Sequence, residues 1–402
     1  MVLKMIYDAK FFDQVFERRG HDATKWDYPL FVKDNKDIVP MWVADMDFRT
    51  PDCIVDAMAK RLEHHAFGYC KIPQAYFDGI AKWQKERYGV DGVTADQIDY
   101  QNGVLGGVSS FVEAYSLPGD WILLNDTCYT GFQSTIANRG RNIVYSPVKE
   151  TADGWALDIE DMEKKIIEKK PPIMIFCNPH NPTGHVWSKE EMIAVVELCD
   201  KYGMLICSDE IWADFQTGGH KHVPLHTCCP RAKEIVFSMY APSKTFNLAG
   251  LVGSYHVIFN KYLRERMDKV ASLSHYNSIN VMSMHALVGA YSETGREWVD
   301  ELLEVLSSNV NYAYDYICKN FKGVKLAKPE GTYMLYLDCE EWCKEHNMSM
   351  DDLLKAGVAV GVIWQDGRPF NRPFAIRVNL AVPHSRVIDA MDRLDKYVFN
   401  AK

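Results

Sequence analysis

The 402-residue chain has no uninterrupted apolar run approaching the roughly 20 residues that a membrane-spanning helix needs. It also lacks low-complexity tracts and any excess of positive charge, because 45 Lys and Arg stand against 54 Asp and Glu, a net charge of -9. Nucleic-acid partners favour clustered cations, so this balance argues against them. Residues 1–4 lead into mixed polar sequence and not into an apolar signal core. We therefore expect a cytoplasmic protein that binds neither membrane nor nucleic acid.

No C-x-x-C pair occurs among the 11 cysteines, and no secretion signal is evident, so we expect free thiols. Six cysteines have apolar or strand-like neighbours, which predicts that they are buried. These six are Cys53, Cys128, Cys177, Cys199, Cys207 and Cys318.

The densest group of possible metal ligands is His220, His222, His226, Cys228 and Cys229. Histidines spaced i, i+4 on a helix can bind zinc, but the proline at position 224 breaks such a helix. The alternative is a polar surface loop, and we expect no metal site.

Short apolar runs alternate with helical patterns through the middle of the chain. Strands are expected at residues 121–125, 142–146, 173–177, 204–208, 235–238 and 253–259. Continuous apolar runs are typical of strands covered on both faces. A capping-box sequence at 188–191 opens one of the intervening helices, and Asp158 opens another. This alternation predicts an α/β protein with a mainly parallel sheet.

The pattern changes after about residue 298, where one long helix is expected to run to about residue 321. Residues 331–338 and 374–380 then alternate like strands of a smaller α+β lobe. We predict a large cofactor-binding domain at 51–294 and a small domain built from 1–50 and 295–402.

Four polar segments follow expected strands, where loops of parallel sheets carry chemistry. They are the glycine segment at 102–107, NPHNPTG at 178–184, SDEI at 208–211 and APSKT at 241–245. The glycine segment precedes a helix expected from about Val108, and free N–H groups there suit a phosphate; a plain strand-to-helix turn is the alternative. Asp209 and Lys244 each follow a core strand, where a charged side chain is costly unless it is paired or used.

The order of these four segments resembles the aminotransferase-like superfamily of pyridoxal 5'-phosphate (PLP) enzymes, fold type I, over nearly the whole chain. The sequences MWVADMDF at 41–48, AFGYC at 66–70 and APSKTFNLAGL at 241–251 are similar to its bacterial cystathionine β-lyase or cysteine C–S lyase branch. The resemblance implies PLP as cofactor and a three-layer fold. In that fold a mainly parallel seven-stranded sheet is central, with a smaller α+β lobe beside it.

The resemblance also implies roles around the cofactor ring. Lys244 would hold the cofactor aldehyde and act as the catalytic base. Asp209 would pair with the pyridine nitrogen, Asn181 would bond the ring hydroxylate, and Tyr129 would stack on the ring. Trp212 stands where a Tyr or His is usual, so it is expected beside the cofactor without their hydrogen bond.

Phosphate and substrate contacts follow from the same resemblance. The N–H groups of Val104 and Leu105, assisted by Ser243, would hold the phosphate. Tyr69 would reach the phosphate of a neighbouring subunit, which implies a homodimer with shared active sites. Arg377 would clamp the α-carboxylate of a small amino-acid substrate by a bidentate pair.

The branch resemblance favours β-elimination from cystathionine or another S-substituted L-cysteine, giving pyruvate, ammonia and a thiol. The alternative is an aminotransferase, because the same lysine serves both reactions. A dicarboxylate transaminase needs a second cation, for which Arg368 and Arg372 are candidates. Val252 stands where the superfamily often has an arginine that contacts the cofactor phosphate, so we expect the contacts to the phosphate to differ in this chain. A silent regulatory relative is disfavoured because Lys244, Asp209 and Arg377 are all present.

Overall fold

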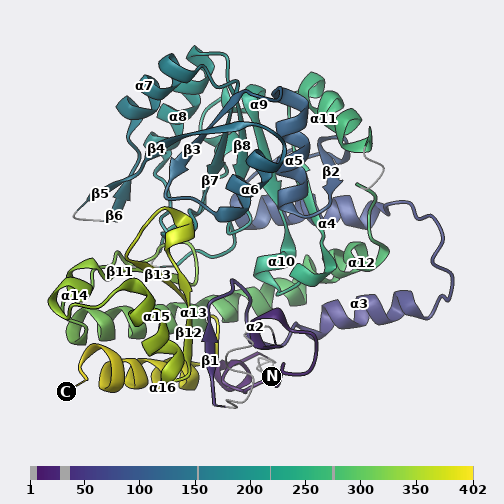
Figure 1. Cartoon of the computed structure of the whole chain (residues 1–402). Coiled ribbons are helices and arrows are strands. Elements are labelled where there is room, and N and C mark those ends of the chain that lie inside the picture. The colour runs from purple at the N-terminus through teal and green to yellow at the C-terminus, as the bar shows by residue number, and fades with distance from the viewer. Residues whose placement is uncertain (1–6, 28–36, 152–153, 218, 274–276, 402) are drawn as a thin grey trace.

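The computed structural model describes residues 7–27, 37–151, 154–217, 219–273 and 277–401, arranged as a large upper lobe and a smaller lower lobe (Figure 1). Its α-helices are α1 (Ala9–Phe12), α2 (Thr24–Asp27), α3 (Asp52–Leu62), α4 (Gln74–Tyr88), α5 (Val104–Tyr115), α6 (Thr130–Asn138), α7 (Ile159–Lys169), α8 (Lys189–Lys201), α9 (Ala232–Ile235), α10 (Pro242–Thr245), α11 (Lys261–Leu273), α12 (Val281–Ala290), α13 (Glu293–Asn320), α14 (Glu340–Glu345), α15 (Met350–Ala359) and α16 (His384–Leu394). Its strands are β1 (Val39–Met41), β2 (Ile98–Gln101), β3 (Trp121–Asp126), β4 (Asn142–Pro147), β5 (Lys149–Thr151), β6 (Gly154–Ala156), β7 (Ile173–Cys177), β8 (Leu205–Asp209), β9 (Val236–Tyr240), β10 (Ser254–Val257), β11 (Met334–Asp338), β12 (Val362–Asp366) and β13 (Ala375–Asn379).

The large lobe is built on a seven-stranded sheet in the order β2-β10-β9-β8-β7-β3-β4. Strands β9, β8, β7, β3 and β4 pair in parallel, whereas β10 is antiparallel to both of its neighbours. The predicted mainly parallel seven-stranded sheet is therefore confirmed. Parallel strands put their C-terminal ends at one edge, so the loops after β8 and β9 meet there.

Helices cover both faces of this sheet and make three layers. Side chains of a strand alternate between faces, so Leu123 of β3 packs with α7 and α8, whereas its neighbours Ile122 and Leu124 pack with α5, α6 and α11. The capping box predicted before α8 is present, because Ser188 and Glu191 bond each other's backbone N–H. Asp158 likewise caps α7.

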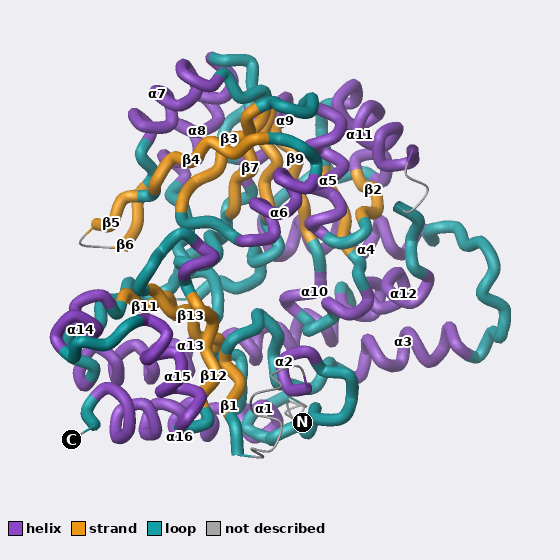
Figure 2. The backbone as a smooth tube through the Cα atoms, viewed as in Figure 1, coloured by secondary structure: helices purple, strands orange, loops and turns teal. Residues whose placement is uncertain are grey.

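The small lobe contains a four-stranded sheet in the order β1-β12-β13-β11. Strand β1 comes from the N-terminal part of the chain and pairs in parallel with β12. Helices α13, α15 and α16 pack around this sheet, which stands apart from the large sheet as a second group of strands (Figure 2). The division at residues 51 and 295 stays a prediction, and residues 1–6, 28–36 and 402 of the predicted small domain lie outside the described part.

Several expectations from the sequence are corrected by the structure. The helix after the glycine segment begins at Val104 and not near Val108, and α13 begins at Glu293 because Ser292 caps it. Strands β11 and β13 are buried at nearly every position instead of alternating, since helices and loops cover both faces. Cys318 is exposed on α13 and Cys53 is half-buried, although both were predicted to be buried.

The described ranges contain no helix that is long and apolar enough to cross a membrane.

Candidate active site

Lys244 lies in α10, directly after the buried strand β9. Its Nζ donates a hydrogen bond to the carbonyl oxygen of Ala44 at 2.8 Å. Burial, and secondarily the charge of Arg377, lowers the pKa of Lys244 to about 8, although Asp45 and Asp209 act in the opposite direction. The neutral form, which a nucleophile requires, is therefore far more populated near physiological pH than it is in an ordinary lysine.

Asp209 is the last residue of β8, and its carboxylate is buried. One oxygen accepts a hydrogen bond from the N–H of Ile211 at 3.0 Å. Burial raises the pKa of Asp209 to about 7, against the lowering effects of the Ile211 N–H and Lys244. A closely placed cation would keep this carboxylate ionised.

Arg377 comes from β13 of the small lobe and faces the large-lobe residues. Its Nη1 donates to Oδ1 of Asn181 at 2.9 Å, and its Nη2 donates to the carbonyl of Trp42 at 3.2 Å. The Nε is buried without a hydrogen-bond partner among the described residues, and the guanidinium lies 4.9 Å from the centroid of the Phe370 ring. Burial lowers the pKa of Arg377 to about 10. A buried guanidinium with donors to spare suits a ligand carboxylate.

The glycine segment forms the N-terminus of α5, with Gly103 as its N-cap at a φ of 74°. The N–H groups of Val104 and Leu105 belong to the first turn and have no acceptor within the helix, which suits an anion. Ser243 precedes Lys244 in α10. The side chain of Val252 lies against this turn, because a Cβ built on Gly103 would be 3.6 Å from its Cγ1.

Tyr129 lies at the start of α6, where the charges of Arg377 and Asp209 both act on its hydroxyl. Burial is the main cause of its raised pKa. A Cβ at Gly131 would come within 2.5 Å of the Tyr129 ring and 2.8 Å of Leu105. Glycine at position 131 therefore lets the tyrosine ring lie beside the N-terminus of α5.

Trp212 is buried beside Lys244, whose Nζ lies 5.8 Å from the centroid of its ring. The structure thus brings Lys244, Asp209, Asn181, Tyr129, Trp212 and Arg377 into one site between the lobes. Tyr69 is separate from it, fully exposed on the extended segment between α3 and α4 that projects from the body of the chain (Figure 1).

The sequence model described as aminotransferase class I and II matches residues 36–394. The chain belongs to this family. It is 34% identical over 349 residues to cystathionine beta-lyase PatB of Bacillus subtilis, covering 87% of this chain and 90% of PatB.

Two solved structures place the chain in the C–S lyase branch of this family. The PLP-bound C–S lyase of Staphylococcus hominis superposes with a TM-score of 0.87 at 28% identity, covering 96% of this chain and 97% of the lyase. Cystalysin from Treponema denticola, which contains PLP, superposes with a TM-score of 0.90 at 28% identity, covering 99% of this chain and all of cystalysin.

The site of this aminotransferase-family protein fits PLP in its donors, acceptors and charges. Asp209 is a buried carboxylate placed to accept a pyridinium proton, and Lys244 is a buried amine able to attack the aldehyde. The first turn of α5 offers free N–H groups for the phosphate. Asn181 turns its oxygen to Arg377, which leaves its amide N–H groups for the ring hydroxylate.

Further residues of the site had no predicted role. Trp42 and Ala44 supply carbonyl oxygens to Arg377 and Lys244, and Tyr333 and Tyr336 lie close enough to Arg377 to act on its charge. The motif at 41–48 signalled only a resemblance. Contacts between segments 200 to 335 residues apart decide which atoms of this motif reach the site.

His222 and His226 are buried, which differs from the polar surface loop that the sequence offered as the alternative, whereas His220 is exposed. His222 is fully buried, with Nε2 2.7 Å from a carboxylate oxygen of Glu210, and His226 is buried with Nδ1 2.9 Å from the Ser238 hydroxyl. Burial lowers the pKa of His226 to about 4. Among the described residues no group of three or more His, Cys, Asp or Glu is arranged to hold a metal.

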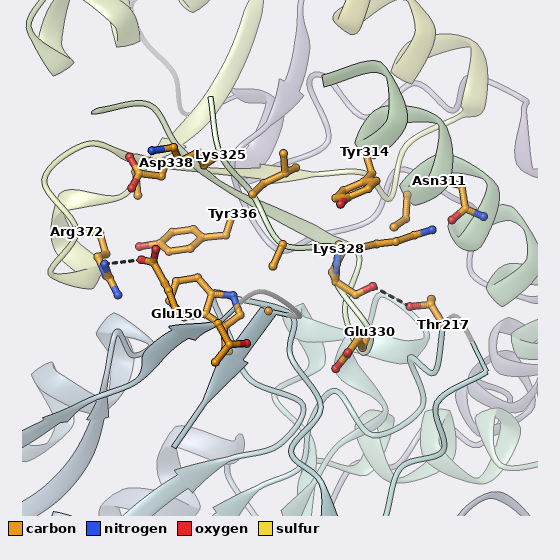
Figure 3. A pocket seen from close by; sticks show the side chains of 18 of the residues that line it. Glu150, Thr217, Asn311, Tyr314, Lys325, Lys328, Glu330, Tyr336, Asp338 and Arg372 are labelled. Carbon is orange, nitrogen blue, oxygen red and sulfur yellow. Dashed lines mark hydrogen bonds and ion pairs between the residues drawn. The ribbon is translucent and has the colours of Figure 1, made fainter. Parts of the chain in front are cut away.

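A cavity of about 740 Å³ lies between the lobes beside the site (Figure 3). The β5–β6 hairpin contributes Glu150 and Trp155, and the small lobe contributes Tyr336, Lys328 and Arg372. Glu150 accepts a hydrogen bond from Arg372 at 2.9 Å across this space. Tyr336 is the β11 partner of Arg377, so the side chains of these two residues lie on the same face of the small sheet.

We predict that the apoprotein captures PLP at a rate that rises with pH through about 8 and then levels off. Only the neutral amine of Lys244 attacks the aldehyde, and its lowered pKa makes this form predominate above about pH 8. The visible absorbance of bound cofactor, followed from about pH 6 to about pH 10, measures the rate. Lys244→Ala provides the background, and a rate still climbing at the upper limit would contradict the shifted pKa.

Proposed function

We propose that the protein is a PLP-dependent carbon–sulfur lyase that releases pyruvate, ammonia and a thiol from cystathionine or another S-substituted L-cysteine. Its relatives of the same length include proteins named cystathionine beta-lyase and C–S lyase. The observation that carries the proposal is Arg377, which is buried beside Lys244; among the described residues its Nε has no hydrogen-bond partner and its guanidinium has no carboxylate partner. An amino-acid carboxylate fits this position.

The reaction needs one base and one acceptor of electrons. Bound PLP supplies the electron sink for charge that develops at Cα. Lys244 removes the Cα proton, Arg377 holds the carboxylate, and Asp209 retains a proton on the pyridine nitrogen. The bond from Cβ to sulfur then breaks, the thiolate leaves with its electron pair, and water converts the remaining three-carbon unit to pyruvate and ammonia.

The surroundings of Arg377 favour a lyase over a dicarboxylate transaminase. Arg368 pairs with Asp351 and Asp366, at 2.7 and 2.8 Å, and Arg372 pairs with Glu150 at 2.9 Å. Both candidate cations for a distal carboxylate are therefore already paired with acids of this chain. Transamination remains the competing outcome of the first experiment, since it begins with the same proton transfer.

We predict that the PLP-loaded protein converts L-cystathionine, without an added oxo acid, to equal amounts of pyruvate and thiol over many turnovers. Coupled assays of both products measure this, and Lys244→Ala should lose turnover because the base is gone. An aminotransferase would instead stop after one turnover, with the cofactor in its amine form, until an oxo acid is added.

Arg377→Ala should raise KM for the amino acid about 10- to 100-fold, because a charge-assisted hydrogen bond contributes about 1.5–3 kcal/mol. Arg372→Ala is the matched control: it removes a guanidinium paired with Glu150 and should change KM less than about twofold. Steady-state kinetics at constant pH measures both variants. An unchanged KM in Arg377→Ala would exclude the carboxylate role.

We further propose a homodimer in which Tyr69 reaches the phosphate of the neighbouring subunit. Its side chain is fully exposed on the segment between α3 and α4, which extends away from the body of the chain in Figures 1 and 2. A tyrosine there is unable to serve its own site and is free to enter another.

Light scattering should therefore give twice the mass of the chain, and Tyr69→Phe should weaken PLP binding about tenfold through loss of one hydrogen bond to a charged group. Tyr262→Phe, a similarly exposed tyrosine on α11, should leave PLP binding unchanged. A fully active monomer would overturn the shared site.

A further inference from the structure

The segment that carries Lys244 is held on both sides of the lysine. Thr245 is buried and donates a hydrogen bond from Oγ1 to Oδ2 of Asp214 at 2.7 Å. Asn247 has a φ of 60°, accepts a hydrogen bond from Met46 N at 3.1 Å and donates to Met46 O at 2.8 Å. The direction of the lysine side chain depends on both attachments.

Asp214 belongs to the segment that follows Asp209 at the end of β8 and that also carries Trp212. Its carboxylate is 3% exposed, which is costly for an ionised group unless hydrogen bonds compensate. Its Oδ1 accepts from Trp83 Nε1 at 3.1 Å and from the Tyr88 hydroxyl at 2.8 Å, with Arg87 Nε 3.7 Å away. Asp214 is thus fixed from α4 by its Oδ1, and it holds Thr245 by its Oδ2.

Short hydrogen bonds also stiffen the stretch between Asp209 and Asp214. Glu210 accepts at its carboxylate from Tyr240, Ser238 and the N–H of Leu225, at 2.7, 2.9 and 3.1 Å. The N–H of Ala213 donates to the Glu210 carbonyl at 3.0 Å. A rigid stretch therefore separates the carboxylate that faces the cofactor from the carboxylate that holds the lysine segment.

We propose that Asp214 is a positioning residue, which acts through Thr245 to hold Lys244 at a constant place relative to Asp209. Asp214 is assigned no contact with substrate or cofactor. It sets where the amine meets the aldehyde while Asp209 sets where the pyridine nitrogen lies. This inference rests on Lys244 as the PLP lysine and does not depend on whether the protein is a lyase or an aminotransferase.

Loss of the hydrogen bond from Thr245 to Asp214 should let the segment that carries Lys244 move toward solvent. The buried amine would then regain hydration, so its pKa should rise from about 8 toward the ordinary value of 10.5. The geometry of attack on the aldehyde should worsen at the same time. Displacements of about 1 Å from a productive geometry lower rates on the order of 100-fold.

The test compares Thr245→Val, which keeps the shape and removes the hydroxyl, with Thr245→Ser, which keeps the hydroxyl. We expect Thr245→Val to move the pH midpoint of PLP capture by the apoprotein upward and to slow capture on the order of 10- to 100-fold. Thr245→Ser should behave like the natural protein. Thr227→Val is the matched control: it removes a hydroxyl that donates to the Pro224 carbonyl at 2.7 Å, and it should also behave like the natural protein.

The proposal would be overturned if Thr245→Val captured PLP with the same pH midpoint and rate as the natural protein. It would also be overturned if Thr245→Ser failed to restore them. Thermal melts show whether each variant is folded at the assay temperature. If Thr245→Val is unfolded at that temperature, Asp214→Asn must show the same upward shift of the pH midpoint of PLP capture. An unchanged midpoint in Asp214→Asn counts against the proposal. Cofactor capture is measured without amino acid, so a failed lyase assay leaves this result unaffected. If Lys244→Ala captured PLP as well as the natural protein, Lys244 would not be the PLP lysine and the proposal would lose its basis.

Discussion

Desolvation acts on three charged side chains that meet between the two sheets. It raises the pKa of Asp209 to about 7, lowers that of Lys244 to about 8 and lowers that of Arg377 to about 10. Burying such groups without full pairing opposes folding, so the rest of the structure must hold them in place. A cofactor with a basic nitrogen and an aldehyde would supply a cation for Asp209 and an electrophile for Lys244. An amino-acid carboxylate would supply the anion for Arg377.

The fold meets this requirement by bringing strand ends from two sheets to one point. Strands β8 and β9 are parallel neighbours, so Asp209 and the segment of Lys244 emerge at the same edge. Strand β13 belongs to the small sheet and brings Arg377 from the opposite side, where Asn181 accepts its hydrogen bond. The segment after β1 closes the site with the carbonyls of Trp42 and Ala44.

The choice of reaction depends on what surrounds this shared centre. Removal of the Cα proton, the role proposed for Lys244, is common to elimination and transamination, so the lysine alone does not separate them. Arg368 and Arg372 are paired with acids, which supports the proposal that Arg377 binds the substrate carboxylate. The bonds from Thr245 to Asp214 and from Asn247 to Met46 keep the base in place while the substrate changes.

The sequence by itself determined the mainly parallel sheet and the strands leading to Asp209 and Lys244, because apolar runs and caps are local signals. The cofactor class followed from the family resemblance that its short motifs carry. It placed the start of α5 late and misjudged His222 and His226, whose burial depends on Glu210 and Ser238 from neighbouring strands. Only the tertiary structure decided which carbonyl oxygens accept hydrogen bonds from Lys244 and Arg377. It also decided that Asp214 accepts a hydrogen bond from Thr245. The physical reason is that these hydrogen bonds join residues 31 to 335 positions apart, and no pattern within one segment specifies which distant segment will lie beside it.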